Sequence, residues 1–247
     1  MVENSKAYWE QYWNKEKRNT NSEFLFHKLL QQYDLKVNNY FEFGCAPGNN
    51  MVYFANKYGC NVSGVDFIDD RLIKDYLDKE RILSYQIFQE DVYDFETENK
   101  YDFVGSYGFI EHFDDPETII KKHKEVVKDG GYLFIEVPNI RYINYLINKL
   151  LSKEILSKHN FSIMDLKKLR EIILDEEFEE VFVNYYLTSY FQANSESGKL
   201  KKYKNIEKIY KIINFIMNKL SLDNIPNKFM SPYIIVLAKK KEKVKSL

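Results

Sequence analysis

Residues 40–50 read YFEFGCAPGNN and decide the fold of this 247-residue chain. A hydrophobic run at 40–43 carries one acid, Glu42, and ends abruptly in the small residues of 44–48. A helical pattern follows over 51–58. The stretch predicts a strand, a tight turn and the start of a helix. In such an arrangement glycine lets the backbone approach a cofactor closely.

Strand-like and helix-like segments alternate on both sides of this turn. Asp115 and Pro116 form a good helix start, and Gly130-Gly131 a helix stop. The alternation predicts right-handed crossovers and a mostly parallel sheet. The expected strands are 39–43, 61–66, 83–88, 101–106 and 131–137, and the expected helices are 50–58, 69–79 and 116–128.

The pattern changes after residue 138. Helical stretches at 140–151 and 163–174 precede strands at 181–187 and 233–237, which predict an antiparallel edge. We therefore predict a single α/β domain with a Rossmann-like, doubly wound sheet of seven strands. Its expected parts are a helical cap over 1–35, a core over 36–187 and 231–240, and a helical insertion over 188–230 that could act as a lid.

The composition is that of a soluble globular protein. Hydrophobic residues make up 45% of the chain and charged residues 30%, and the net charge of −1 gives no bias toward nucleic acid or membrane. Two cysteines form no disulfide framework, which favours a reducing cytoplasm. The N-terminal stretch lacks the apolar region of a signal peptide, and no stretch is apolar enough to predict a membrane span.

Acids stand where the second and third strands are expected to end. Asp66 follows Glu42 by 24 residues, and a carboxylate at this point can accept both ribose hydroxyls of a nucleotide cofactor. Phe67 beside it could pack on the adenine or serve ordinary packing. Asp91 and Val92 follow the third strand. Taken singly, such acids are ordinary loop residues, and their spacing from Glu42 is what indicates a site.

The order of these motifs resembles the class I S-adenosylmethionine-dependent methyltransferases, in particular the group of the ubiquinone-biosynthesis O-methyltransferases. The resemblance covers residues 36–187 and the last strand. Segment 42–48 is similar to the family's acid-x-Gly-x-Gly-x-Gly motif, with Ala46 in place of the middle glycine. Segment 102–112, which ends in Glu111-His112, and segments 130–139 and 159–169 complete the likeness.

The resemblance implies S-adenosylmethionine as the cofactor and S-adenosylhomocysteine as its product. In the family the acid at the Glu42 position fixes the cofactor's amino group, the turn lies along its methionine part, and the Asp91-Val92 position meets the adenine. The expected cofactor-binding residues are Glu42, Gly44, Cys45, Ala46, Gly48, Asp66, Phe67, Asp91, Val92 and Tyr107.

Methyl transfer requires little catalysis from the protein. A sulfonium methyl is already electrophilic, so the fold must hold a nucleophile in line with it and exclude water. A hydroxyl acceptor also needs a base, and His112 and His159 are the candidates. Alternatively, His112 could simply brace its loop, and His159 could contact the substrate. His27 and His123 are expected to be structural. The four histidines are scattered without metal-ligand spacing, so we predict no metal.

The identity of the methyl acceptor is the feature that the sequence predicts least well. The residues expected to contact it are Tyr12, Trp13, Phe109, Asn139 and Arg141. Segment 199–220 has helical spacing and seven lysines against one acid. It fits a solvated helix face, a lid that attracts an anionic substrate, or (over 203–220) a helix in peripheral contact with a membrane or partner.

We predict transfer to an oxygen of a small anionic or sugar-related metabolite, as in bacterial surface-polysaccharide biosynthesis. The alternatives are a phosphate-type oxygen and a quinone or lipid-linked acceptor. Segment 106–109 lacks the Asn/Asp-Pro-Pro-aromatic motif of DNA-base methylation, and no nucleic-acid partner is expected.

Two rival classes stay open. An NAD-dependent enzyme shares the turn and the ribose acid, but Gly44, Ala46 and Asn49 depart from its Gly-x-Gly-x-x-Gly series. A non-catalytic cofactor-binding protein could use the same fold. The sequence predicts no oligomeric state.

Overall fold

The structure, a computed structural model, describes residues 6–15, 24–151, 156–188 and 225–243, together with residues 215 and 219. Most of the predicted insertion 188–230, including nearly all of the lysine-rich segment 199–220, lies outside the described residues. The predicted division into cap, core and insertion therefore stays a prediction.

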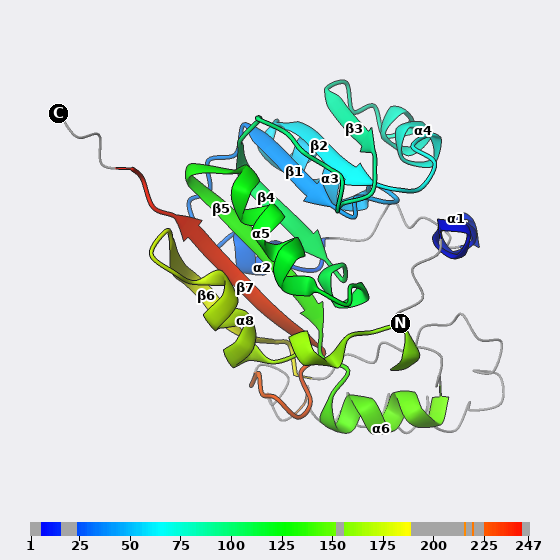
Figure 1. The fold of residues 1–247 in the computed structure, drawn as a ribbon, viewed down its shortest axis with the longest axis vertical. Coiled ribbons are helices and arrows are strands. Elements are labelled where there is room, and N and C mark those ends of the chain that lie inside the picture. The colour runs from blue at the N-terminus through cyan, green and yellow to red at the C-terminus, as the bar shows by residue number, and fades with distance from the viewer. Residues whose placement is uncertain are drawn as a thin grey trace.

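The core is one seven-stranded sheet in the order β3-β2-β1-β4-β5-β7-β6 (Figure 1). Strands β3, β2, β1, β4 and β5 are parallel, and β7 runs antiparallel to both β5 and β6. The predicted fold is confirmed, with the antiparallel strand one place in from the edge. The strands are β1 (Asn39–Phe43), β2 (Asn61–Asp66), β3 (Tyr85–Gln89), β4 (Tyr101–Tyr107), β5 (Val127–Pro138), β6 (Phe178–Tyr186) and β7 (Tyr233–Lys240).

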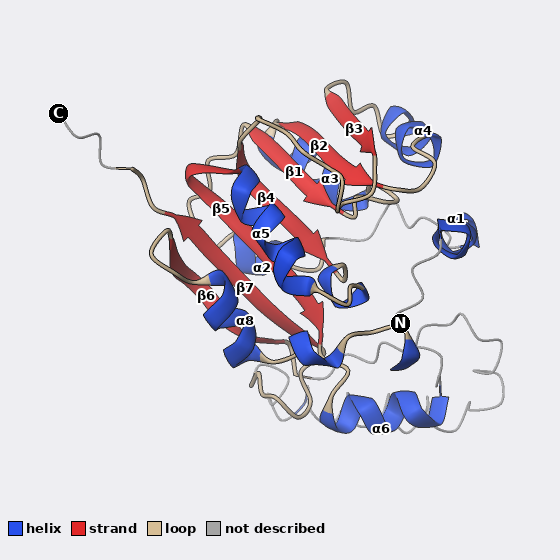
Figure 2. Cartoon of the chain, viewed as in Figure 1, coloured by secondary structure: helices blue, strands red, loops and turns tan. Residues whose placement is uncertain are grey.

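Helices cover both faces of this sheet (Figure 2). Their starts follow the local sequence: at α5, for example, the Asp115 carboxylate accepts a hydrogen bond from Thr118 N over 3.2 Å. The α-helices are α1 (Lys6–Lys15), α2 (His27–Leu30), α3 (Asn49–Tyr58), α4 (Arg71–Lys79), α5 (Pro116–Val126), α6 (Tyr142–Leu151) and α8 (Leu166–Ile173), and the 3-10 helices are η1 (Ile110–His112) and η2 (Phe161–Ile163).

Two apolar clusters, one on each face, hold the layers together. Successive side chains of β1 point to opposite faces, as a strand requires. Phe43 points toward α5, where its ring stacks on buried His123 at 3.8 Å between centroids. Tyr40 points toward α3, where its ring stacks on Phe54 at 3.9 Å. Because both faces of β1 are buried over 40–43, this part of the strand is hydrophobic apart from Glu42.

The strand order reverses between β1 and β4. At such a switch point the loops that follow the two strands leave on opposite faces, and a crevice opens at the carboxyl ends of the strands. The turn at 44–48 follows β1 and therefore lies at this crevice. Within the described part of the chain, no helix combines the length and the apolar character needed to span a membrane.

Candidate functional site

A cavity of about 480 Å³ lies at the carboxyl ends of the parallel strands. Its wall comes from the segments that follow β1, β2, β3 and β4, which chain topology brings together, and from α1. The described lining residues are Trp9, Trp13, Glu42, Gly44, Cys45, Ala46, Pro47, Asn49, Asn50, Val65, Asp66, Phe67, Glu90, Asp91, Val92, Tyr93, Tyr107, Gly108, Phe109, His112, Phe113 and Asp114.

The turn after β1 is held against β2 by its own backbone. The amides of Gly44 and Cys45 both donate to the carbonyl oxygen of Val65, over 2.9 and 3.3 Å. Gly44 has φ +68°, and a Cβ there would lie 2.2 Å from the Phe109 ring. Only glycine fits such a position. Ala46, which replaces a glycine of the family motif, has no positive φ, and this explains why a side chain is tolerated there.

Gly48 closes the turn but is not among the described lining residues. It precedes α3 with φ +101°, and a Cβ there would lie 3.3 Å from the Tyr76 ring and 3.4 Å from Ile73. Gly48 therefore lets α3 start close to α4 and shapes the turn without lining the cavity.

Glu42 is a buried carboxyl group at the floor of the cavity. Its Oε1 accepts from Asn50 Nδ2 over 2.7 Å, and its Oε2 accepts from the Tyr40 hydroxyl over 3.1 Å. Burial raises the pKa of Glu42 to about 8, although both hydrogen bonds lower it. The group is thus set to meet a cation, since a positive partner would compensate its desolvation. Asn50 was not predicted as a site residue.

Asp66 is the last residue of β2, and both of its carboxylate oxygens accept hydrogen bonds from backbone amides. Oδ2 accepts from Ala46 N over 3.1 Å, and Oδ1 accepts from Ile68 N over 3.2 Å. Burial raises the pKa of Asp66, and the backbone hydrogen bonds oppose the shift. The carboxylate is therefore fixed in place between two strand ends at the cavity wall.

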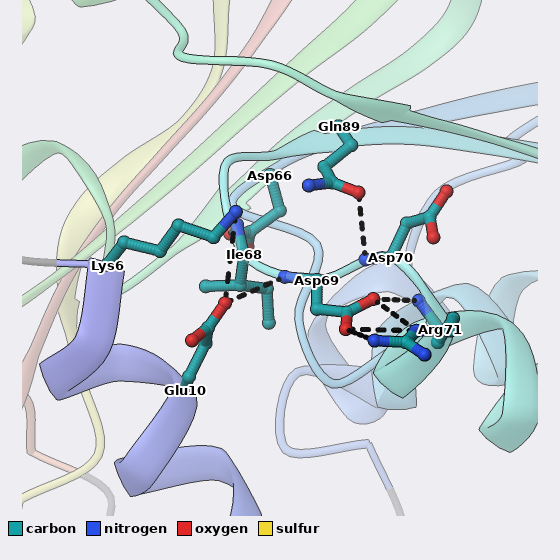
Figure 3. A network of polar contacts seen from close by, with 8 residues as sticks. All are labelled: Lys6, Glu10, Asp66, Ile68, Asp69, Asp70, Arg71 and Gln89. Carbon is teal, nitrogen blue, oxygen red and sulfur yellow. Dashed lines mark hydrogen bonds and ion pairs between the residues drawn. The ribbon is translucent and has the colours of Figure 1, made fainter.

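Helix α1 docks on the loop that follows Asp66 (Figure 3). Glu10 Oε1 accepts a hydrogen bond from Asp69 N over 3.3 Å and lies 3.9 Å from Lys6 Nζ. This contact places the α1 side chains Trp9 and Trp13 in the cavity wall. Helix α1 thus covers the cavity from the side of Asp66.

The structure brings together the three residues that were considered for the adenine side. Phe67, Asp91 and Val92 all line the cavity. Val92 is buried, whereas Asp91 is exposed and its Oδ1 accepts from Tyr93 N over 2.9 Å. The loop after β3 therefore offers an apolar contact next to a polar one.

Tyr107 and Phe109 form the wall at the end of β4. The Tyr107 hydroxyl lies 3.5 Å from that of Tyr40, which links it to Glu42. Phe109 packs edge-on against Phe113 at 4.9 Å between centroids. The half of the cavity nearest β4 is thus mainly aromatic.

His112 lines the cavity, yet it is poorly suited to act as a base. It is buried, its Nδ1 lies 3.0 Å from the carbonyl oxygen of Lys158, and its ring packs edge-on against Trp9 at 4.9 Å. Burial, followed by the proximity of His159, lowers the pKa of His112 to about 3. The imidazole is neutral at pH 7 but weakly basic, whereas general bases work best with a pKa near the working pH.

The two candidate histidines lie together. Their ring centroids are 4.7 Å apart, although the residues are 47 positions apart in the chain. His159 is half-buried and is not among the described lining residues. Glu111 completes the group, since its Oε1 lies 3.7 Å from His112 Nε2. The sequence prediction of scattered histidines therefore does not hold for this pair.

Three of the predicted acceptor contacts lie elsewhere in the described structure. Tyr12 packs on Trp13 at 4.7 Å between centroids but is not among the lining residues. Asn139 donates to the carbonyl oxygens of Lys228 and Ser231, and so ties the end of β5 to the segment before β7. Arg141 pairs with the Asp165 carboxylate over 3.2 Å. Trp13 and Phe109 do line the cavity.

Several lining residues were missed by sequence reasoning. They stand within two residues of predicted ones, near a strand end or in the segment that follows it, and position relative to the strand end is the signal that could have found them. They are Pro47, Asn49, Asn50, Val65, Glu90, Tyr93, Gly108, Phe113 and Asp114.

The chain belongs to a family of methyltransferase domains, whose model matches residues 13–193. The match covers most of the core and all the strand ends that build the cavity. It confirms the class predicted from the sequence, the class I S-adenosylmethionine-dependent methyltransferases, and S-adenosylmethionine as the cofactor of that class.

Curated relatives include both O- and N-methyltransferases. A ubiquinone biosynthesis O-methyltransferase from Hydrogenovibrio crunogenus is 31% identical over 117 residues, 46% of this chain and 48% of that protein. A pavine N-methyltransferase from Thalictrum flavum subsp. glaucum is 34% identical over 98 residues, 38% of this chain and 28% of that protein. The chain thus matches less than half the length of either relative.

Solved structures share the fold at low sequence identity. An S-adenosylmethionine-dependent methyltransferase from Archaeoglobus fulgidus has a TM-score of 0.59 and 19% identity, with 94% of this chain and 100% of that chain covered. The N-methyltransferase NodS from Bradyrhizobium japonicum, solved with S-adenosylhomocysteine, has a TM-score of 0.58 and 14% identity, with 96% and 98% covered.

Proposed function

We propose that this protein transfers a methyl group from S-adenosylmethionine to an oxygen or nitrogen of a small molecule held at the aromatic end of the cavity. The observation that carries the proposal is the single cavity wall described above. The predicted cofactor residues other than Gly48 form one part of it, and the tryptophans of α1 and the aromatic residues after β4 form the other.

The residues present fit the cofactor of this class. Gly44 leaves room beside Phe109 that a Cβ would fill, so the turn can lie against an extended ligand. Buried Glu42 faces this turn and can pair with a cationic amino group. Asp66 is positioned for ribose hydroxyls, and Phe67 and Val92 for a flat base.

Bound S-adenosylmethionine supplies an electrophilic methyl group on a sulfonium. The chain's own contribution is to bind, orient and exclude water. Trp9 and Trp13 close the cavity on the α1 side, while Tyr107 and Phe109 close it at β4. His112 stands at this end as a neutral imidazole, because burial lowers its pKa to about 3.

The charges of the cavity favour an uncharged or cationic acceptor. Its described lining residues include five acids and neither lysine nor arginine. Nothing in this part of the wall would balance an anionic sugar or a phosphate, whereas aromatic rings bind flat and cationic groups well. The basis of the predicted anionic acceptor, the lysine-rich segment 199–220, lies almost wholly outside the described residues.

The relatives agree with an acceptor of this kind, since one is named for O-methylation and another for N-methylation. We therefore place oxygen and nitrogen acceptors on an equal footing, and we propose a flat, uncharged or cationic molecule ahead of a polysaccharide precursor.

An assay of S-adenosylhomocysteine release tests the proposal. Purified protein is incubated with S-adenosylmethionine and, in separate reactions, with phenols and catechols, secondary amines, and sugar phosphates. We expect turnover with members of the first two groups and a large loss on Trp9→Ala. Turnover with sugar phosphates alone would overturn the acceptor class. Cofactor binding without turnover on any acceptor would favour a non-catalytic cofactor-binding protein.

A further inference from the structure

Glu111, His112 and His159 form a cluster at the end of the cavity that α1 covers. One coordinating atom from each residue lies within 4.8 Å of the other two. His112 Nε2 and Glu111 Oε1 are 3.7 Å apart. Two imidazoles and one carboxylate are a donor set that proteins use for Zn²⁺ and for divalent iron, with further positions left open.

We propose that these three residues bind a divalent transition-metal ion whose open position takes an oxygen of the methyl acceptor. The sequence predicted no metal because Glu111-His112 and His159 are far apart in the chain. The binding of an ion does not depend on the proposed function. The role of the ion toward the methyl acceptor does rest on the proposed function.

The orientation of His112 suits a metal ligand. Its Nδ1 lies 3.0 Å from the carbonyl oxygen of Lys158. Because a carbonyl only accepts, Nδ1 carries the hydrogen, and the lone pair is on Nε2, the atom that faces Glu111. Metal-ligating histidines are commonly fixed in this way, with the second ring nitrogen donating to a backbone carbonyl.

The loop that carries His159 is tied to η1 on both sides of the histidine. Before it, the Lys158 carbonyl binds His112. After it, Asn160 N donates to the Glu111 carbonyl oxygen over 2.6 Å, and Asn160 Nδ2 donates to the Phe113 carbonyl oxygen over 2.9 Å. The backbone therefore holds His159 next to the other two residues, so the cluster is a built feature of the fold.

The buried carboxyl groups at the cluster would be stabilised by a cation. Glu111 is 1% exposed, and its buried Oε2 has no hydrogen-bond partner among the described residues. Glu136 lies close enough to repel Glu111 electrostatically, is 5% exposed, and likewise has an unpartnered Oε1. The ammonium of Lys158 lies 3.5 Å from the centre of the Tyr8 ring. Two buried carboxylates with unpartnered oxygens are costly in their ionised form, which a bound cation would stabilise.

A metal ion at this cluster would supply a positive charge, whereas the described lining residues include neither lysine nor arginine. It would orient an acceptor through one donor atom, and as a Lewis acid it would lower the pKa of a coordinated hydroxyl. The position is suitable because His112 belongs both to the cluster and to the cavity wall.

Titration of the full chain with metal ions tests the site directly. Protein dialysed against a chelator is titrated with Zn²⁺ in a calorimeter and with Co²⁺ by absorption and tryptophan fluorescence, since Trp9 packs on His112. We expect one ion per chain and quenching of Trp9 by Co²⁺. Glu111→Gln and His159→Ala should each weaken binding at least tenfold. The matched control, His27→Ala, should bind like the wild type, because His27 lies on α2 and contacts Tyr53.

Three results would overturn the proposal: no one-to-one binding by the wild type, equal affinity in the wild type and both cluster variants, or a thiolate absorption band with Co²⁺, which would place the ion at Cys45 or Cys60. Circular dichroism checks folding, and His159→Gln replaces the alanine variant if that one unfolds. S-adenosylhomocysteine binding is measured on the same samples. Wild-type protein that binds S-adenosylhomocysteine but no ion would refute the metal site alone. The opposite result would refute the proposed function, and with it the ion's role toward the acceptor, but not the binding of the ion.

Discussion

Asp66 Oδ2 accepts a hydrogen bond from the backbone amide of Ala46 over 3.1 Å. The acid predicted to bind the ribose therefore also holds the turn that follows β1. Its other oxygen accepts from Ile68 N, so the carboxylate joins β2 to the turn on one side and to the α4 loop on the other. A substitution of Asp66 thus affects the turn and the cofactor together.

Two variants of Asp66 separate these effects. Asp66→Ala removes the acceptor for Ala46 N and any ribose contact, so we expect a lower Tm and a loss of about 1–3 kcal/mol in S-adenosylhomocysteine affinity. Asp66→Asn keeps one acceptor oxygen for the turn, so its Tm should fall less, while its affinity should still drop. Calorimetric titration and thermal unfolding of both variants measure the two quantities. Unchanged affinity in both variants would remove Asp66 from the cofactor site.

Gly44 and Gly59 form a matched pair for the close approach at the turn. Both have positive φ, +68° and +64°, but a Cβ on Gly44 would lie 2.2 Å from Phe109, whereas a Cβ on Gly59 would meet nothing within 4 Å. Gly59→Ala should cost about 1–2 kcal/mol for the left-handed backbone alone. Gly44→Ala should cost clearly more and displace Phe109. Urea unfolding compares them, and equal costs would show that the contact with Phe109 is unimportant.

Glu42 should release a proton when the cofactor binds. Its pKa is raised to about 8, so at pH 7 most ligand-free molecules carry this proton. A cationic amino group favours the ionised form, so binding should expel close to one proton at pH 7 and almost none well above pH 8. Titrations in buffers of different ionisation enthalpy measure the release. Glu42→Gln should abolish it, and proton uptake at pH 7 would contradict the assignment.

His123 should make stability fall in acid. Burial lowers its pKa to about 3, although its hydrogen bond to the Ile119 carbonyl opposes the shift. The unfolded chain therefore binds a proton below about pH 6.5 that the folded chain refuses, and stability is lost as the pH falls from 6.5 toward 3. His123→Phe keeps an aromatic ring on Phe43 and removes the titration. Urea unfolding between pH 7 and 5 should show a slope flatter by up to about 1.4 kcal/mol per pH unit. Equal slopes would argue against the shift.

Most of the fold could be predicted because each strand of the sheet is visible as a local pattern in the sequence. Strands β1 and β2 match the predicted bounds, since each is a short hydrophobic run ended by a turn. Strand β5 begins at Val127, four residues before the expected start, because Gly130 takes φ +76° inside the strand where a helix stop was expected. A glycine pair alone does not distinguish these two uses.

The cofactor side of the site could also be predicted, because strand ends meet at one edge of a parallel sheet. Contacts that depend on packing could not. Asn50 reaches Glu42 from α3, Trp9 reaches His112 from α1, and the His159 loop is placed by hydrogen bonds to η1. Spacing along the chain carries no record of these contacts, which is why the histidine pair was missed.

Titration of the purified full chain with S-adenosylhomocysteine in a calorimeter, with NAD as the control, tests the central claim most directly. We expect one-to-one binding of S-adenosylhomocysteine in the micromolar range and no binding of NAD. Binding of NAD without binding of S-adenosylhomocysteine would contradict the assignment of the cavity from Glu42 onward.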